Sequence, residues 1–260
     1  AQLAAKSKED VRQDALYRLV QIAVEEKAWS DVAKYAALLR QQFPKGRYDW
    51  EAAFQLGQAQ LQQGLAEQAV RTLQRVVEQR DDPRVRGATW YPHAWVLLAE
   101  AYFQRKDYEK VATCAQAFTR DFPDSPVRYR MDHVLGRALK RQARFDEARE
   151  AFRRVVESVP GRRTETAAQA QLMIAETYFL QKNYQKALLE YLKVYHLYAF
   201  PEWQAAGLFQ AGLCDEMLGN WSDAAKTYEL LLSRFPKSDL VGQAETRLAR
   251  IRKRSKASKN

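Results

Sequence analysis

The chain has 260 residues, of which 47% are hydrophobic and 28% charged, and its formal net charge is +10. This composition excludes an intrinsically disordered chain. No apolar run approaches the roughly 18 residues that a membrane-spanning helix needs, which excludes a conventional span. The length allows one or two compact domains, or one elongated array.

A regular marker runs along the whole chain. Prolines recur at comparable intervals, and a marker residue precedes each of six prolines by 15 or 17 positions. The six markers are Trp29, Ala66, Tyr108, Phe145, Tyr184 and Trp221. Successive markers are 37, 42, 37, 39 and 37 residues apart. A period of this size, sustained over six copies, indicates stacked supersecondary units and not a single globular fold.

Each unit has the pattern of two helices joined by a short turn, because apolar residues recur at helical spacing before and after turns such as QRKDY. Proline ends the second helix, since it has no amide to donate and disfavours a helical residue before it. In the stretch FPDSP, residues 122–126, we expect Phe122 to fill the joint and Ser125 to cap the following helix. Ser238 is expected to cap the last helix in the same way.

In chain order, residues 1–10 are expected to form the frayed front of the first helix. Six repeats follow, at approximately 13–46, 50–83, 92–125, 129–162, 168–201 and 205–237. A capping helix is predicted at 238–254 and a basic disordered tail at 255–260. The joint at 80–92 is the longest, so it is the segment expected to be irregular or mobile. The predicted fold class is all-α.

Specific signatures identify the repeat. Trp95-x2-Leu98-Ala99-x2-Tyr102 matches the first-helix signature of tetratricopeptide repeats, with Ala in place of Gly. The second-helix signature, Ala-x3-aromatic followed by Pro, occurs as Ala148-x3-Phe152 and again as Ala224-x3-Tyr228. The chain therefore resembles the tetratricopeptide repeat proteins over residues 10–237. The resemblance implies a right-handed solenoid of six helical hairpins plus a capping helix.

The long period and the Phe-Pro-x-Ser joints resemble the bacterial cell-envelope branch of that family. The branch includes the outer-membrane barrel-assembly lipoprotein and the Tol–Pal-associated coordinator. This resemblance implies a periplasmic or envelope-associated protein. Cys114 and Cys214 are expected to be unpaired core residues, and unpaired cysteines favour a reducing compartment instead. A cytoplasmic location is therefore the alternative.

The sequence contains no catalytic constellation. Its three histidines fall in different repeats and so cannot converge on one metal ion, and it has neither a phosphate-binding loop nor a nucleophile elbow. We therefore expect no enzyme activity, no cofactor and no metal. The aromatic residues that mark the turns are predicted to be core residues and not base-stacking platforms.

The resemblance implies a concave groove lined by the first helices of the repeats. Carried onto this sequence residue by residue, the fourth repeat contributes a basic belt: Arg130, His133, Arg137, Lys140 and Arg141. Neighbouring repeats contribute apolar positions: Phe103, Leu172, Phe179 and Phe209. Such a groove suits a protein or peptide partner with acidic and apolar residues, with Arg137 at the centre of the contact. The alternative is a solubilising basic face whose apolar neighbours pack the seams between repeats.

Two other functions stay open. Residues 247–260 carry seven bases and no acid, which makes a nucleic-acid-associated adaptor the first alternative to a protein-binding scaffold. A regulatory repeat domain of a larger enzyme is the second.

Overall fold

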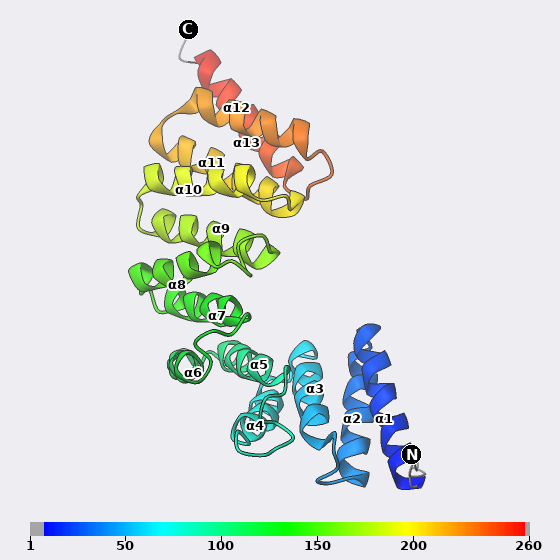
Figure 1. Ribbon diagram of the computed structural model, residues 1–260. Helices are drawn as coiled ribbons and strands as arrows, with labels where there is room; N and C mark the ends of the chain where they lie inside the picture. Colours follow the sequence, from blue (N-terminus) through cyan, green and yellow to red (C-terminus); the bar gives the residue numbers. More distant parts are fainter. Residues whose placement is uncertain (1–7, 258–260) are drawn as a thin grey trace. The chain divides into compact units, whose positions relative to one another are not determined.

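The computed structural model describes residues 8–257, with side chains to Arg254. Residues 1–7 of the expected frayed front and 258–260 of the expected tail lie outside the described residues. Within the described range the chain forms thirteen helices and no strand. The helices are labelled in Figure 1. The all-α fold class predicted from the sequence is confirmed.

Twelve of the thirteen helices are paired into hairpins. The pairs are α1 (Lys8–Glu25) with α2 (Trp29–Gln42), α3 (Asp49–Gln62) with α4 (Ala66–Val77), α5 (Tyr91–Gln104) with α6 (Tyr108–Asp121), α7 (Arg128–Arg141) with α8 (Phe145–Glu157), α9 (Glu165–Leu180) with α10 (Tyr184–Leu197), and α11 (Pro201–Leu218) with α12 (Trp221–Arg234). The last helix, α13 (Val241–Ala257), begins three residues later than predicted and continues into the expected disordered tail. Leu248 and Ile251 of α13 are buried in one cluster with α12, and this packing anchors the longer helix.

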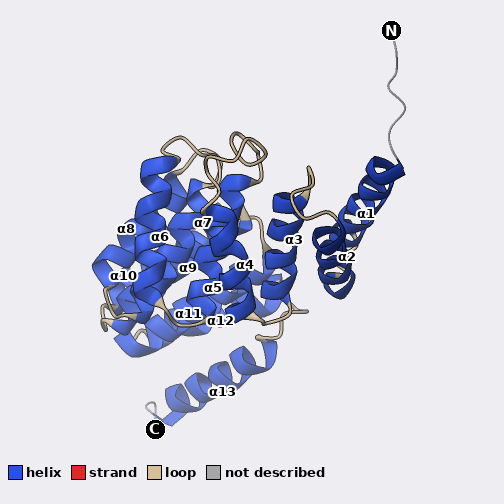
Figure 2. Cartoon of the chain, turned by 90° about the horizontal axis from the view of Figure 1, so that it is seen from below, coloured by secondary structure: helices blue, strands red, loops and turns tan. Residues whose placement is uncertain are grey.

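The chain divides into two compact units, residues 1–134 and 135–260, and the boundary falls within α7. In the first unit, each helix from α1 to α6 packs against the next one along the chain. The second unit repeats this order from α8 to α13. The first helices of successive hairpins also touch, as α1 and α3 do, or α9 and α11. Figure 2 shows the helices joined by loops of different lengths.

Within a hairpin, the two helices approach most closely where the first helix carries a small residue. A methyl group built on Gly212 would lie 2.6 Å from the ring of Tyr228, and one on Gly136 would lie 2.6 Å from the ring of Phe152. Both rings are fully buried. Small residues are therefore needed at this position because the second helix places a large side chain directly against their Cα atoms.

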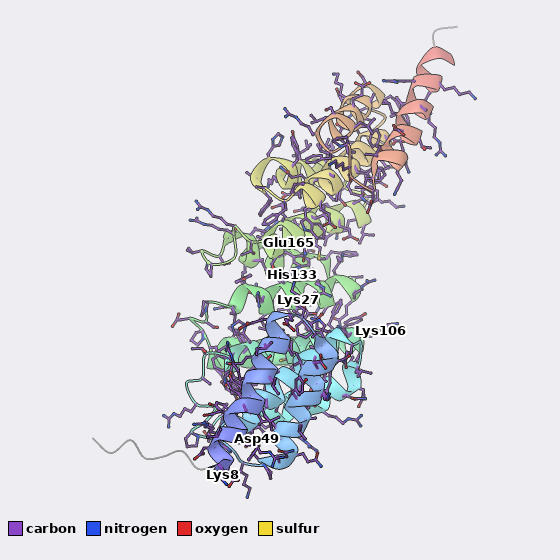
Figure 3. All side chains as sticks on the ribbon, turned by 90° about the vertical axis from the view of Figure 1, so that its right-hand side faces the viewer. Lys8, Lys27, Asp49, Lys106, His133 and Glu165 are labelled. Carbon is purple, nitrogen blue, oxygen red and sulfur yellow. The ribbon has the colours of Figure 1, made fainter. Side chains whose placement is uncertain are left out.

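The turn inside every hairpin has one backbone conformation. The residue two positions before each second helix is left-handed, with φ between 57° and 80°. These residues are Lys27, Gly64, Lys106, Ala143, Lys182 and Gly219, of which Lys27 and Lys106 are labelled in Figure 3. The next residue donates its N–H to a carbonyl five positions back in all six turns, over 2.8–3.0 Å. This is the hydrogen bond of a Schellman motif, which satisfies a carbonyl at the helix end.

The joints between hairpins are filled by aromatic rings, as the sequence predicts for Phe122. Its ring lies 5.7 Å from that of Tyr91 and 5.2 Å from that of Phe118, centroid to centroid. Ser125, which the sequence predicts as the cap of α7, lies in a different position relative to the helix. Ser125 accepts a hydrogen bond from the N–H of Val127, which precedes the first residue of α7, so this serine stabilises the turn before the helix and not its first turn.

The long joint between α4 and α5 is irregular, as predicted, but it is tied down by one carboxylate. Asp82 accepts hydrogen bonds from the indole of Trp50 at 2.9 Å and from the guanidinium of Arg84 at 2.6 Å. Arg84 also donates to the carbonyls of Lys45 and Gly46, in the preceding joint. The Asp82–Arg84 pair therefore connects two successive joints of the first unit, and its hydrogen bonds hold the pKa of Asp82 well below the usual value.

The close approach at Gly212 predicts that Gly212→Ala lowers the free energy of unfolding by about 1–3 kcal/mol, the usual cost of overpacking a filled core. Urea unfolding followed by circular dichroism measures it. The matched control is Gly242→Ala on α13, because a methyl group there meets nothing within 4 Å. A Gly212→Ala variant as stable as this control would contradict the close contact.

The Asp82 network predicts a stability that depends on pH. A carboxyl group with a lowered folded-state pKa contributes stability above its unfolded pKa of about 3.9, and the contribution is lost as the pH falls toward the lowered value. Wild-type protein should therefore be more stable than Asp82→Asn at neutral pH, and the difference should shrink between pH 5 and pH 2. Urea midpoints of both proteins across this range give the comparison. A difference that does not change with pH would rule out ionised Asp82 as its source.

Candidate functional site

The predicted groove residues fall in both units and differ in exposure. Arg130 and Arg141, near opposite ends of α7, are exposed. His133, marked on α7 in Figure 3, is only 7% exposed, beside the equally buried Asp132. Arg137 and Lys140 are half-buried. The basic belt is therefore not one continuous surface, because its second member points into the core.

In the second unit, Lys140 connects α7 to α9. Its ammonium group lies 2.5 Å from a carboxylate oxygen of Glu176, and the Lys140 side chain is only 14% exposed. The bond fixes which face of α9 lies beside the end of α7. Leu172 and Phe179 share that face of α9, one turn before and one turn after Glu176. Lys140, Leu172 and Phe179 are thus brought together around Glu176, whose negative charge offsets the positive charge of Lys140.

The predicted apolar residues of the groove mostly pack against side chains of neighbouring helices. Leu172 and Phe179 are half-buried against the cluster that contains Tyr191 and Cys214, and the Phe179 ring lies 5.3 Å from that of Tyr184. In the first unit, Phe103 lies in the same relation to Tyr108, at 5.7 Å. These side chains therefore have both an exposed edge and a structural contact.

Phe209 lies deeper than the sequence suggests. It is 6% exposed, and its ring packs 5.9 Å from that of Tyr228 in the cluster between α11, α12 and α13. A side chain so covered has little surface to offer a partner. Its role in the structure is to fill the core behind α13.

Many bases of residues 128–154 have acidic partners within the chain. Arg144 binds Glu147 through both carboxylate oxygens. Arg149 is 5% exposed, and its guanidinium binds Asp146, Thr177 and Gln181 and lies 4.2 Å from the ring centre of Tyr178. The excess of positive charge in this segment is therefore smaller at the surface than the sequence count suggests.

The basic C-terminal segment is folded onto the second unit as far as the structure describes it. Arg247 binds Glu216 at 3.2 Å, and Arg252 binds Glu229 at 2.8 Å. The guanidinium of Arg254 lies 4.2 Å from the centre of the Trp221 ring. Three of the seven bases that suggested a nucleic-acid-binding tail thus hold α13 against its neighbours.

The structure also contains a hollow that the sequence does not reveal. It lies at the joint between α12 and α13, beside the start of α11, and its volume is 560 Å³. Its apolar wall comprises Pro201, Trp203, Ala206, Phe235, Pro236 and Leu240, with Arg234 and Lys237 at its edge. A smaller hollow of 370 Å³ occupies the equivalent joint of the first unit, around Phe122. The Phe-Pro motif was the available signal, but the sequence shows it only as a boundary between helices.

Residues that could support covalent or metal chemistry are dispersed. Within the described residues, no group of three or more His, Cys, Asp or Glu side chains could hold a metal ion. Cys114 and Cys214 are free and buried, as expected, and burial raises the pKa of each thiol to about 12. No described helix is both long and apolar enough to cross a membrane.

Comparison with solved structures shows likeness to several proteins, among them these three. Pseudomonas aeruginosa PilF matches with a TM-score of 0.63 and 15% identity, over 92% of this chain and 100% of that one. RapI in its apo form matches with a TM-score of 0.68 and 10% identity, over 95% and 99%. The repeats of a kinesin light chain from Podosopora anserina match with a TM-score of 0.58 and 17% identity, over 72% and 95%. At these identities the likeness concerns the fold alone.

Sequence comparison is more specific about the family. A search of curated proteins finds no match. A family profile described as a tetratricopeptide repeat-like domain matches residues 4–162, and two tetratricopeptide repeat profiles match residues 133–201 and 206–238. Such repeats generally serve as modules for protein–protein interaction. The chain belongs to the tetratricopeptide repeat family.

Proposed function

We propose that this tetratricopeptide repeat protein is a non-enzymatic scaffold that binds acidic partner segments on the α7–α9 face of its second unit. We define this face by Arg137, Lys140, Arg141, Leu172 and Phe179. The Lys140–Glu176 bond carries the proposal, because it joins the end of α7, which carries two further bases, to the face of α9 that carries the half-buried Leu172 and Phe179. A partner segment would meet both kinds of side chain within a few turns of helix.

The charges on this face favour an acidic partner. Glu176 already offsets Lys140, and the exposed Arg141 adjoins that pair at the end of α7. An arginine can bind a carboxylate through two parallel hydrogen bonds, which gives orientation as well as attraction. The apolar edges of Leu172 and Phe179 would then contact aliphatic or aromatic side chains of the same segment. Recognition of an acidic, amphipathic segment follows from this combination.

The variant Arg141→Glu tests this proposal. We expect it to weaken binding of a short fluorescein-labelled peptide of alternating Glu and Leu by about tenfold, a loss of about 1.4 kcal/mol. Fluorescence anisotropy titration measures the affinity. Phe179→Ala should weaken binding independently of charge. Raised salt should weaken binding of the wild type, since exposed charges are screened over about 8 Å at physiological ionic strength.

The matched control is Lys226→Glu, which makes the same change of charge at a highly exposed residue of α12. It should bind the acidic peptide like the wild type. Equal losses for Arg141→Glu and Lys226→Glu would mean that only net charge matters, and the proposed face would be wrong. Preferential binding of a Lys-Leu peptide, or of single-stranded RNA, would also exclude an acidic protein segment as the ligand.

We further propose that the scaffold acts in a bacterial envelope complex, in the periplasm. The support is the resemblance of its Phe-Pro-x-Ser joints to envelope repeat proteins. The two free thiols argue for the alternative, a cytoplasmic location. Fractionation of the native host, with marker enzymes for both compartments, separates the two. Recovery in the cytoplasmic fraction would exclude the envelope proposal and leave the scaffold function standing.

A further inference from the structure

The outer face of α1 is apolar and uncovered in the structure. Val11, Leu19 and Ile22 are 54%, 40% and 38% exposed, and Ala15 between them is exposed as well. Their spacing of four, four and three residues places all four on one side of the helix. We call these four residues the α1 outer face. The opposite side of α1 holds Val20, which is fully buried in the cluster with α2.

The corresponding positions are covered in the other hairpins. One repeat later, the residues equivalent to Ala15, Leu19 and Ile22 are Ala52, Leu56 and Ala59, which pack into the cluster around α2. The equivalent residues of α11 and α13 are buried against α10 and α12. They are Ala211 and Cys214 on α11, and Ala244, Leu248 and Ile251 on α13. In this fold, therefore, the α1 outer face is the surface with which a first helix packs on another helix.

The outer face of α13, the last described helix, differs from that of α1. The exposed side chains of α13, as far as Arg254, are almost all polar or charged, among them Glu245, Arg250 and Lys253. A polar outer face is what a terminal helix of a repeat array needs to face water. Of α1 and α13, the first and last helices that the structure describes, only α1 has an apolar stripe on its outer face, and a covering helix would stabilise it.

The charges beside the stripe indicate which helix fits. Lys8 and Arg12 flank its N-terminal half, and Glu25 and Glu26 lie at its C-terminal end. A second α1 laid antiparallel on the first would bring Lys8 of each copy opposite Glu25 and Glu26 of the other. The same register sets Val11 against Ile22 of the second copy, and Ala15 against Leu19. The four apolar residues, and Lys8 with Glu25 and Glu26, are therefore complementary to themselves under a two-fold axis.

We propose that the α1 outer face is a homodimer interface, in which two copies of the chain pair antiparallel through α1. The contact is isologous and so closes on itself, giving dimers and no larger assembly. One pair of helices buries less than the roughly 1,200 Å² of a standard stable interface. The dimer is accordingly weak and dissociates at low concentration. The proposed contact includes no residue of the α7–α9 face and does not depend on the proposed function.

Sedimentation velocity of the full chain from low to high micromolar concentration is the first test. The wild type should shift from monomer to dimer, and Leu19→Glu should raise the dimer dissociation constant about tenfold or more. Leu189→Glu is the matched control, because Leu189 on α10 is 63% exposed but lies outside α1. Circular dichroism melts of both variants show whether each is folded. A wild type that stays monomeric throughout, or equal effects of the two variants, would overturn the proposal.

A charge exchange tests the antiparallel register. The double variants Lys8→Glu/Arg12→Glu and Glu25→Lys/Glu26→Lys should each dimerise more weakly than the wild type, because like charges then meet across the axis. A mixture of the two should form heterodimers, and the variant with all four changes should recover wild-type association. If the double variants weaken association, and neither their mixture nor the variant with all four changes restores it, the α1–α1 pairing is excluded.

Discussion

Each first helix inside the array has two opposite faces to bury, and the arrangement of the hairpins depends on this constraint. One face packs on the second helix of its own hairpin, where Gly212 meets the Tyr228 ring and Gly136 meets the Phe152 ring. The other packs on the preceding hairpin, as Ala52 and Ala59 do against α2. A helix with two apolar faces is stable only between neighbours. Stacking is therefore the condition under which these short helices persist.

The turns supply the geometry that this packing needs. In all six hairpins a left-handed residue is followed by a residue whose N–H donates to the carbonyl five positions back. Only Gly64 and Gly219 are glycines, so four turns hold a lysine or alanine in a conformation that costs an L-residue roughly 1–2 kcal/mol. The side-chain contacts of the paired helices offset this cost. Local strain is thus accepted where tertiary packing requires a fixed reversal of the chain.

Several charged side chains also serve to join neighbouring helices. Arg149 is buried among Thr177, Gln181 and Tyr178, where it joins α8 to α9, and Arg247 joins α13 to α11 through Glu216. These arginines act as cross-links between helices, because a guanidinium can satisfy several acceptors at once. The net charge of a segment is consequently a poor guide to its surface. Whether a basic side chain such as Arg141 stays exposed depends on which acidic side chains the neighbouring helices place beside it.

The sequence by itself determined the all-α class, the period and the hairpins. These features depend on spacing along one chain, and spacing is visible in the sequence. It also marked Arg137, Lys140 and Arg141 as neighbours on one helix. Only the tertiary structure decided that His133 and Phe209 are buried and that Lys140 is paired with Glu176. It likewise decided that residues 247–254, the described part of the basic C-terminal segment with its side chains, belong to a docked helix. The reason is that burial and ion pairing depend on contacts between different helices, which a one-dimensional pattern of residues does not specify.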